Sequence, residues 1–87
     1  MHTPDIKTAV EIFDRFPEIG NAEIFQLFGA GKQKTASMKN AVKRIMHERN
    51  VKTLLPHNID TTIAYEVWGI NIDDYRKRYA RIKKNGV

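Results

Sequence analysis

Apolar residues recur at three- and four-residue spacing along most of this chain, and proline or glycine interrupts the pattern at intervals. That spacing places side chains on one face of a helix. The first stripe follows Thr3-Pro4, a typical helix start, and stops at Pro17, while a short second stripe follows the candidate cap Asn21 and stops at Gly29. The stripes consist of Ile6, Ala9, Val10, Phe13 and Phe16, and then of Ile24, Leu27 and Phe28 with Phe25 beside them. We therefore predict two helices in this part of the chain.

Two longer amphipathic helices are predicted further along the chain. The third helix follows a glycine-bearing turn at residues 29–33 and runs to about Asn50. The final helix has Asn71 or Asp73 as its candidate cap, and Lys83-Lys84 suit its C-terminal end. The residues expected to face inward are Met38, Ala41, Val42, Ile45 and Met46 in the third helix, and Ile72, Tyr75, Tyr79 and Ile82 in the final one.

Residues 60–69 fit two periods. Ile63, Val67 and Ile70 suit a helix capped by Asp60 or Thr61. Alternation of Ile63, Tyr65 and Val67 instead suits a strand, which residues 51–55 could pair with as a hairpin. We favour the helix, which gives five helices in all, and keep a β-hairpin over residues 51–68 as the alternative.

The chain has 87 residues and no cysteine, so packing rather than disulfides must stabilise one small domain. We expect a single domain over residues 1–87, with a core at 1–50, a connector at 51–59 and a C-terminal part at 60–87. No apolar run reaches the length of a membrane span, and the N-terminus lacks the features of a secretory signal. We therefore expect a cytoplasmic protein with no membrane partner.

The net charge of +5 is unevenly distributed along the chain. Residues 1–31 contain two basic residues against five acidic ones, whereas residues 32–49 contain six against one. A second basic cluster lies in the final helix, between residues 76 and 84. Concentrated positive charge is what a polyanion-binding surface needs, so the two clusters indicate a nucleic-acid partner.

The outer face of the third helix is polar, as the helical period predicts. Its amide, hydroxyl and cationic side chains suit hydrogen bonds to base edges, with Asn40 matching adenine and Lys43 or Arg44 matching guanine. The residues expected to face bases are Gln33, Ser37, Asn40, Lys43 and Arg44. The residues expected to hold phosphates are Lys32, Lys34 and Lys39 and, from the final helix, Arg76, Lys77 and Arg81.

The run Ile24-Phe25-Gln26-Leu27-Phe28-Gly29, followed by Lys34-Thr35-Ala36-Ser37-Met38-Lys39-Asn40-Ala41-Val42, resembles the motif of helix-turn-helix DNA-binding regulators. The small size and basic charge are similar to those of accessory regulators and excisionase-type proteins of phages and mobile elements. The resemblance implies a mainly α, compact five-helix bundle with a tri-helical helix-turn-helix core, whose third helix enters the major groove. With the hairpin it implies a winged helix, whose wing tip would be residues 56–60. The chain differs from the motif in having Phe25 at a usually small position and a longer turn, reaching Lys34.

A short internal repeat is also present. Phe25 to Gly29 and Tyr65 to Gly69 share the order aromatic, polar, aliphatic, aromatic, glycine. The repeat predicts a second helix-turn-helix-like pair at the C-terminal end of the chain. Asp73 and Asp74 would repel phosphates there, so we expect that pair to have a structural or dimerising role.

No catalytic, cofactor or metal site is predicted. The segment from Gly29 to Lys32 fails as a phosphate-binding loop because Gln26 and Gln33 occupy its required glycine and hydroxyl positions, and the three histidines lack metal-ligand spacing. We expect a non-enzymatic protein that binds double-stranded DNA, as a homodimer because one short helix reads few base pairs. The alternatives are an interaction module for an acidic protein partner, and RNA binding through Tyr65, Trp68, Tyr75 and Tyr79.

Overall fold

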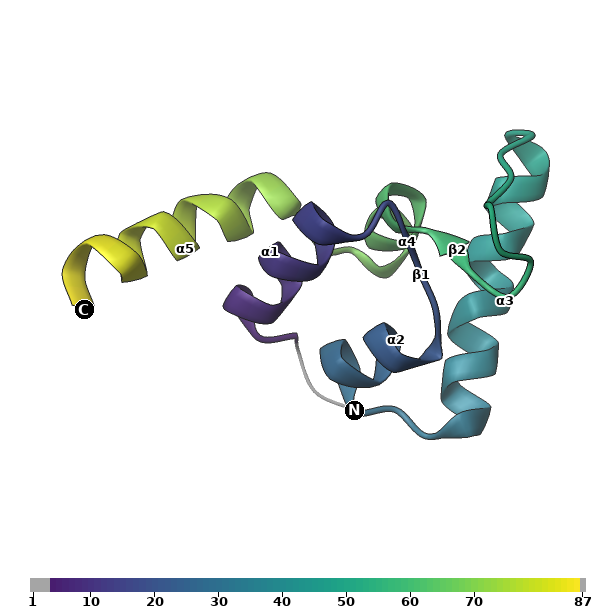
Figure 1. The fold of residues 1–87 in the computed structure, drawn as a ribbon, viewed down its shortest axis with the longest axis horizontal. Coiled ribbons are helices and arrows are strands. Elements are labelled where there is room, and N and C mark those ends of the chain that lie inside the picture. The colour runs from purple at the N-terminus through teal and green to yellow at the C-terminus, as the bar shows by residue number, and fades with distance from the viewer. Residues whose placement is uncertain (1–3, 87) are drawn as a thin grey trace.

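The computed structural model describes residues 4–86, with side chains as far as Lys84, and these residues are mainly helical. The five predicted helices are present in this range, together with one short pair of strands (Figure 1). In chain order, the elements are α1 (Ile6–Arg15), β1 (Glu18–Ile19), α2 (Asn21–Phe28), α3 (Lys32–Glu48), β2 (Ile59–Asp60), α4 (Thr61–Trp68) and α5 (Ile72–Gly86). The molecule is elongated, because α3 stands at one end and α5 extends from the other.

Helix α1 begins at Ile6, two residues later than a cap at Thr3 would place its start. Its N-cap is Asp5, whose carboxylate accepts a 3.1 Å hydrogen bond from the Thr8 amide. An aspartate at this position satisfies an otherwise unpaired amide of the first turn. Thr3, the predicted cap, lies outside the described residues. Of the predicted stripe, Ala9 and Val10 are buried, but Phe16 lies beyond the helix and is exposed.

The turn between α2 and α3 is shorter than the sequence indicated. Helix α3 begins at Lys32, so residues 29–31 alone connect the two helices, and Gly29 adopts the predicted left-handed conformation with φ of 63°. Asn21 is the first helical residue rather than the cap. Gly20 is the N-cap instead, and its amide donates a 2.8 Å hydrogen bond to the carboxylate of Glu23. Because Gly20 has no side chain, this is only one half of a capping box, and the Asn21 side chain takes no part in it.

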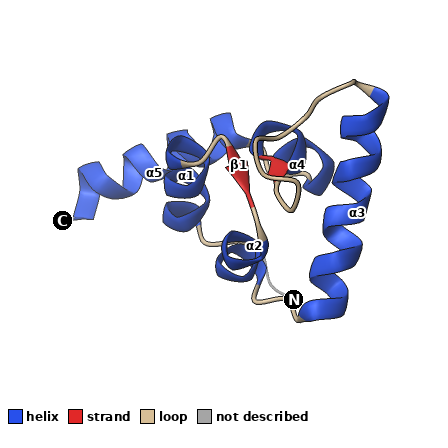
Figure 2. Ribbon diagram, turned by 45° about the vertical axis from the view of Figure 1, so that its right-hand side comes forward, coloured by secondary structure: helices blue, strands red, loops and turns tan. Residues whose placement is uncertain are grey.

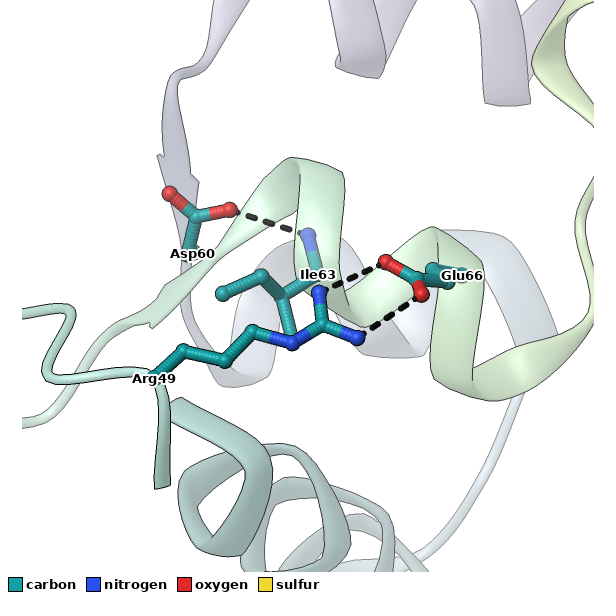
Figure 3. A network of polar contacts seen from close by, with 4 residues as sticks. All are labelled: Arg49, Asp60, Ile63 and Glu66. Carbon is teal, nitrogen blue, oxygen red and sulfur yellow. Dashed lines mark hydrogen bonds and ion pairs between the residues drawn. The ribbon is translucent and has the colours of Figure 1, made fainter. Parts of the chain in front are cut away.

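Residues 60–69 form a helix, so the hairpin alternative and its wing tip are wrong. The Asp60 carboxylate accepts a 2.9 Å hydrogen bond from the Ile63 amide (Figure 3), and Gly69, with φ of 76°, ends α4. Strand β2 pairs with β1 rather than with residues 51–55, in antiparallel register with Asp60 opposite Glu18. These two strands lie near the middle of the molecule, between the helices (Figure 2). The sequence did not indicate this pairing.

The internal repeat corresponds to two similar helix pairs. Helices α2 and α4 have eight residues each, end at a glycine with positive φ, and are followed by a short connection and a longer helix. The second elements of the pairs pack differently, because α3 lies mainly against α4 and β2, whereas α5 lies mainly against α1. The two basic helices therefore lie on opposite sides of the molecule.

The core lies between α1, α2, α3 and α4, and the strand pair contributes to it. Its fully buried side chains include Ile19, Ile24, Leu27, Val42, Ile59 and Tyr65. The Tyr65 hydroxyl donates a 2.7 Å hydrogen bond to the carbonyl of Ala9, which links α4 to α1. Val42 and Met46 hold α3 on this core as predicted, but Ala41 is exposed, because it lies about 100° from Val42 on the helix. The buried side chains on the inner face of α3 thus fix the position of this helix on the core.

Candidate nucleic-acid interface

The outer face of α3 is open to solvent. The buried side chains of this helix, Thr35, Val42 and Met46, all lie on the inner side. The five residues predicted to face bases are exposed together along the opposite side, namely Gln33, Ser37, Asn40, Lys43 and Arg44. Lys32 and Lys34 are exposed at the start of the helix, and Lys39 is partly buried. The structure therefore brings eight of the predicted site residues together on one helix.

The positive charge of this face is not neutralised by the described part of the chain. The ion pairs between described residues join Arg49 to Glu66, Arg76 to Asp14 and Arg78 to Asp74, and none involves a basic residue of the segment 32–44. A cluster of cations without acidic partners produces a local positive potential, and such a potential attracts polyanions.

Lys39 is the most constrained cation of the face. Its ammonium group donates a 3.1 Å hydrogen bond to the side-chain oxygen of Asn21 on α2. Partial burial, and then the positive charge of Lys43, lowers the pKa of Lys39 below its usual value. Both effects disfavour the charged form of Lys39. An anion beside its ammonium group would stabilise the charged form and offset them.

The exposed side of α3 forms a ridge between two hollows. One hollow, the α2–α3 groove, has a volume of about 550 Å³ and includes Phe25, Lys32, Lys39 and Lys43. The other, the α3–α4 groove, has a volume of about 750 Å³ and includes Gln33, Ser37, Arg44 and Val67. Ala36 and Asn40 line both grooves, so they lie on the crest of the ridge. A surface of this shape is complementary to a groove, because the ridge can enter the groove while the two hollows receive the walls on either side of it.

The predicted phosphate contacts of α5 do not lie near α3. Arg76 forms an ion pair with Asp14, and its guanidinium lies 5.3 Å from the centre of the Phe13 ring, so it contacts α1. Lys77 and Arg81 are exposed on the same helix. Because α5 extends from the opposite end of the molecule, these cations form a separate surface (Figures 1 and 2).

Sequence reasoning missed two residues beside the α3 face, Asn21 and Phe25. The sequence pattern predicts Asn21 as a helix cap and places Phe25 beside an apolar stripe. Phe25 is 63% exposed because Ile24, Leu27 and Phe28 already cover the core with the inner face of α2. Because Phe25 lies beside that stripe in a helix of only eight residues, the sequence could have indicated that its ring is exposed.

Two aromatic residues of the RNA alternative belong to the core. Tyr65 is buried, and burial, assisted by the charge of Asp14, raises the pKa of its hydroxyl. Trp68 is partly buried, with its ring 5.3 Å from that of Phe28 in an edge-to-face arrangement. Tyr75 and Tyr79 are partly buried on α5. Stacking of bases on the ring of Tyr65 would therefore require the core to open.

Comparisons with protein-family models, with curated proteins and with solved structures gave no match. Among residues 4–86, no helix has the length and apolar character needed to cross a membrane. The same part of the chain contains no cluster of three or more side chains that could bind a metal ion. Any assignment of function therefore depends on the geometry of the surfaces described above.

Proposed function

We propose that the protein binds double-stranded DNA, with α2, residues 29–31 and α3 acting as a helix-turn-helix unit. The observation that carries this proposal is the exposed face of α3, where cations without acidic partners lie beside amide and hydroxyl side chains. The three-residue connection supports it, because helix-turn-helix units have turns of about three or four residues that often contain glycine.

In this docking, the ridge of α3 enters the major groove. Asn40 lies on the crest, where its amide can form two hydrogen bonds with adenine, and Arg44 can pair similarly with guanine. Gln33, Ser37 and Lys43 are the other base-facing candidates. Lys32, Lys34 and Lys39 contact phosphates, which fixes the register without reading sequence.

One helix of this length contacts only a few base pairs, so specific binding calls for two copies of the chain. A dimer on a two-fold symmetric site is the arrangement that we favour. Lys77 and Arg81 would then contact the DNA backbone outside the region that α3 occupies. Arg76 is the weakest of the three candidate phosphate contacts on α5, because it already forms an ion pair with Asp14. A small basic protein of this type would regulate transcription or assist recombination of a mobile element.

Selection from a random pool of duplexes at near-physiological salt tests the proposal. We expect an enriched sequence, and we expect binding to it to weaken when Lys39 is replaced by alanine. Lys7→Ala is the matched control, because Lys7 is an exposed lysine of α1. Failure to retain any duplex, or equal effects of the two substitutions, would contradict the proposal.

An acidic protein partner is the second candidate, and the α2–α3 groove favours it. This groove combines an exposed aromatic ring with three lysines, which suits an amphipathic helix carrying carboxylates. Binding of such a partner without any affinity for duplex DNA would distinguish this candidate from the first.

A further inference from the structure

Phe25 is an aromatic residue that the core does not use. It lies on α2 and lines the α2–α3 groove together with Ala30 and Thr35. Its 63% exposure leaves most of the ring in contact with water, although the other large apolar residues of α2 are buried. Contact with a ligand would remove this apolar surface from water, which is favourable.

The rim of the same groove is positively charged. Lys32, Lys39 and Lys43 line it, and no described acidic residue forms an ion pair with them. Lys39 is also held against α2 by its hydrogen bond to Asn21. The three lysines come from α3 and Phe25 comes from α2, so a ligand that matches the groove must present negative groups next to an apolar surface.

A single strand of a DNA duplex has this chemistry, because each deoxyribose presents C–H groups between two phosphates. The α3–α4 groove differs, since Arg44 is the one cation among its lining residues. The two sides of the ridge are thus unequal in charge. If the ridge enters the major groove of DNA, one sugar-phosphate backbone lies along the α2–α3 groove and the other along the less charged α3–α4 groove.

We propose that the α2–α3 groove holds the backbone of one strand, with the ring of Phe25 packed on a deoxyribose and with Lys32 and Lys39 on the adjacent phosphates. This inference depends on the proposed duplex binding and assigns one strand to one groove. Phe25 acts here as an apolar contact that fixes the depth and orientation of α3.

The two kinds of contact respond differently to salt. A lysine that neutralises a phosphate releases a counterion, so its loss reduces the slope of log affinity against log salt by about 0.9. An apolar contact releases no counterion, so its loss shifts the affinity equally at every salt concentration. The salt dependence of variants therefore separates the role of Phe25 from that of the lysines.

The test measures the affinity of the enriched duplex by fluorescence anisotropy over a series of salt concentrations. We expect Phe25→Ala to weaken binding about tenfold at each concentration without changing the slope, and Phe25→Trp to retain most of the affinity. Phe16→Ala is the matched control, because Phe16 is an exposed aromatic residue at the end of α1, outside both basic helices. Thermal unfolding of each variant verifies that it folds.

Isotope-filtered nuclear Overhauser spectra of the complex provide a direct readout. We expect contacts from the Phe25 ring protons of each copy to deoxyribose protons of one strand only within its half-site. Wild-type binding with no loss in Phe25→Ala and no such contacts would overturn this inference and leave duplex binding intact. Absence of duplex binding by the wild type, with Phe25-dependent binding of an Asp- and Glu-rich amphipathic peptide, would overturn both and favour the protein partner.

Discussion

Arg49 forms two hydrogen bonds of 2.9 Å with the carboxylate of Glu66, and this pair joins the C-terminal end of α3 to the last turn of α4 (Figure 3). Both side chains are about half exposed to solvent, so water and salt screen their attraction. The side-by-side geometry nevertheless constrains the direction of α3 relative to the core, because a guanidinium and a carboxylate that form two bonds have little freedom to rotate. The pair therefore helps to orient the proposed DNA-binding helix.

Removing this pair should change stability only slightly. We expect Arg49→Ala and Glu66→Gln each to lower the Tm by a small amount, and the double variant to lower it by less than the sum. High salt should reduce the difference from wild type, because these charges are exposed. Additive effects in the double variant would show that the two side chains do not interact in solution.

Glu18 gives the chain a dependence on acid. Hydrogen bonds from the Leu54 amide, then from Asn58 and the Leu55 amide, hold the pKa of Glu18 below its usual value despite partial desolvation. A carboxylate with a lowered folded-state pKa stabilises the protein above its unfolded-state pKa, and this contribution is lost as pH falls through the folded-state value. The loss should therefore occur below about pH 4.5.

Glu18→Gln tests this effect by urea unfolding at neutral pH and at about pH 3.5. We expect the variant to be less stable than wild type at neutral pH, and the difference to shrink at the lower pH. Glu11→Gln, at an exposed position of α1, is the control. A difference that is the same at both pH values would contradict the assignment.

The buried hydroxyl of Tyr65 should contribute measurably to stability. Tyr65→Phe removes the 2.7 Å hydrogen bond to the Ala9 carbonyl while retaining the ring against Phe13. We expect the free energy of unfolding to fall by about 1 kcal/mol. Tyr79→Phe, at a partly buried position of α5, should have little effect in the same denaturant titration. Equal effects would indicate that the buried bond is not formed.

Two glycines provide a matched pair for the turn geometry. Gly69 has φ of 76° and Gly31 has φ of −75°, and an added Cβ would meet no atom within 4 Å at either position. Backbone strain is therefore the main difference between them. We expect Gly69→Ala to lower the free energy of unfolding by about 1–2 kcal/mol. Gly31 is the N-cap of α3, where alanine is less favourable than glycine, so Gly31→Ala should lower it by a smaller amount, about 0.5 kcal/mol. The reverse order would contradict the left-handed end of α4.

The helices could be predicted because their signals are local. The spacing of Ile24, Leu27 and Phe28 and the stop at Gly29 identified α2 from adjacent residues alone. For residues 60–69 the apolar period fits both a helix and a strand. The residues at the two ends of the segment favour the helix, because Asp60 caps its start and Gly69 ends it. Local end signals thus outweighed the alternation that favoured a strand.

The strand pair and the place of α5 could not be predicted, because both depend on contacts between distant residues. Strands β1 and β2 have two residues each, too few to show an alternating pattern, and Thr61 stabilises their pairing by donating to the Phe16 carbonyl. Likewise, the composition of α5 gave no indication that Arg76 would contact Asp14 on α1. The part of the candidate site on α3 was predictable, because the helical period alone defines the exposed face. The contribution of Phe25 was not predictable, because it depends on how α2 packs beside α3.

The central claim is that the exposed face of α3 meets a DNA duplex, and the most direct measurement compares Asn40→Ala with Lys39→Ala on the selected duplex and its single-base variants. We predict that Asn40→Ala loses discrimination at one base pair. We predict that Lys39→Ala weakens binding to every duplex by a similar factor and reduces the salt slope by about 0.9. Equal losses from the two substitutions, or no loss from either, would contradict the claim.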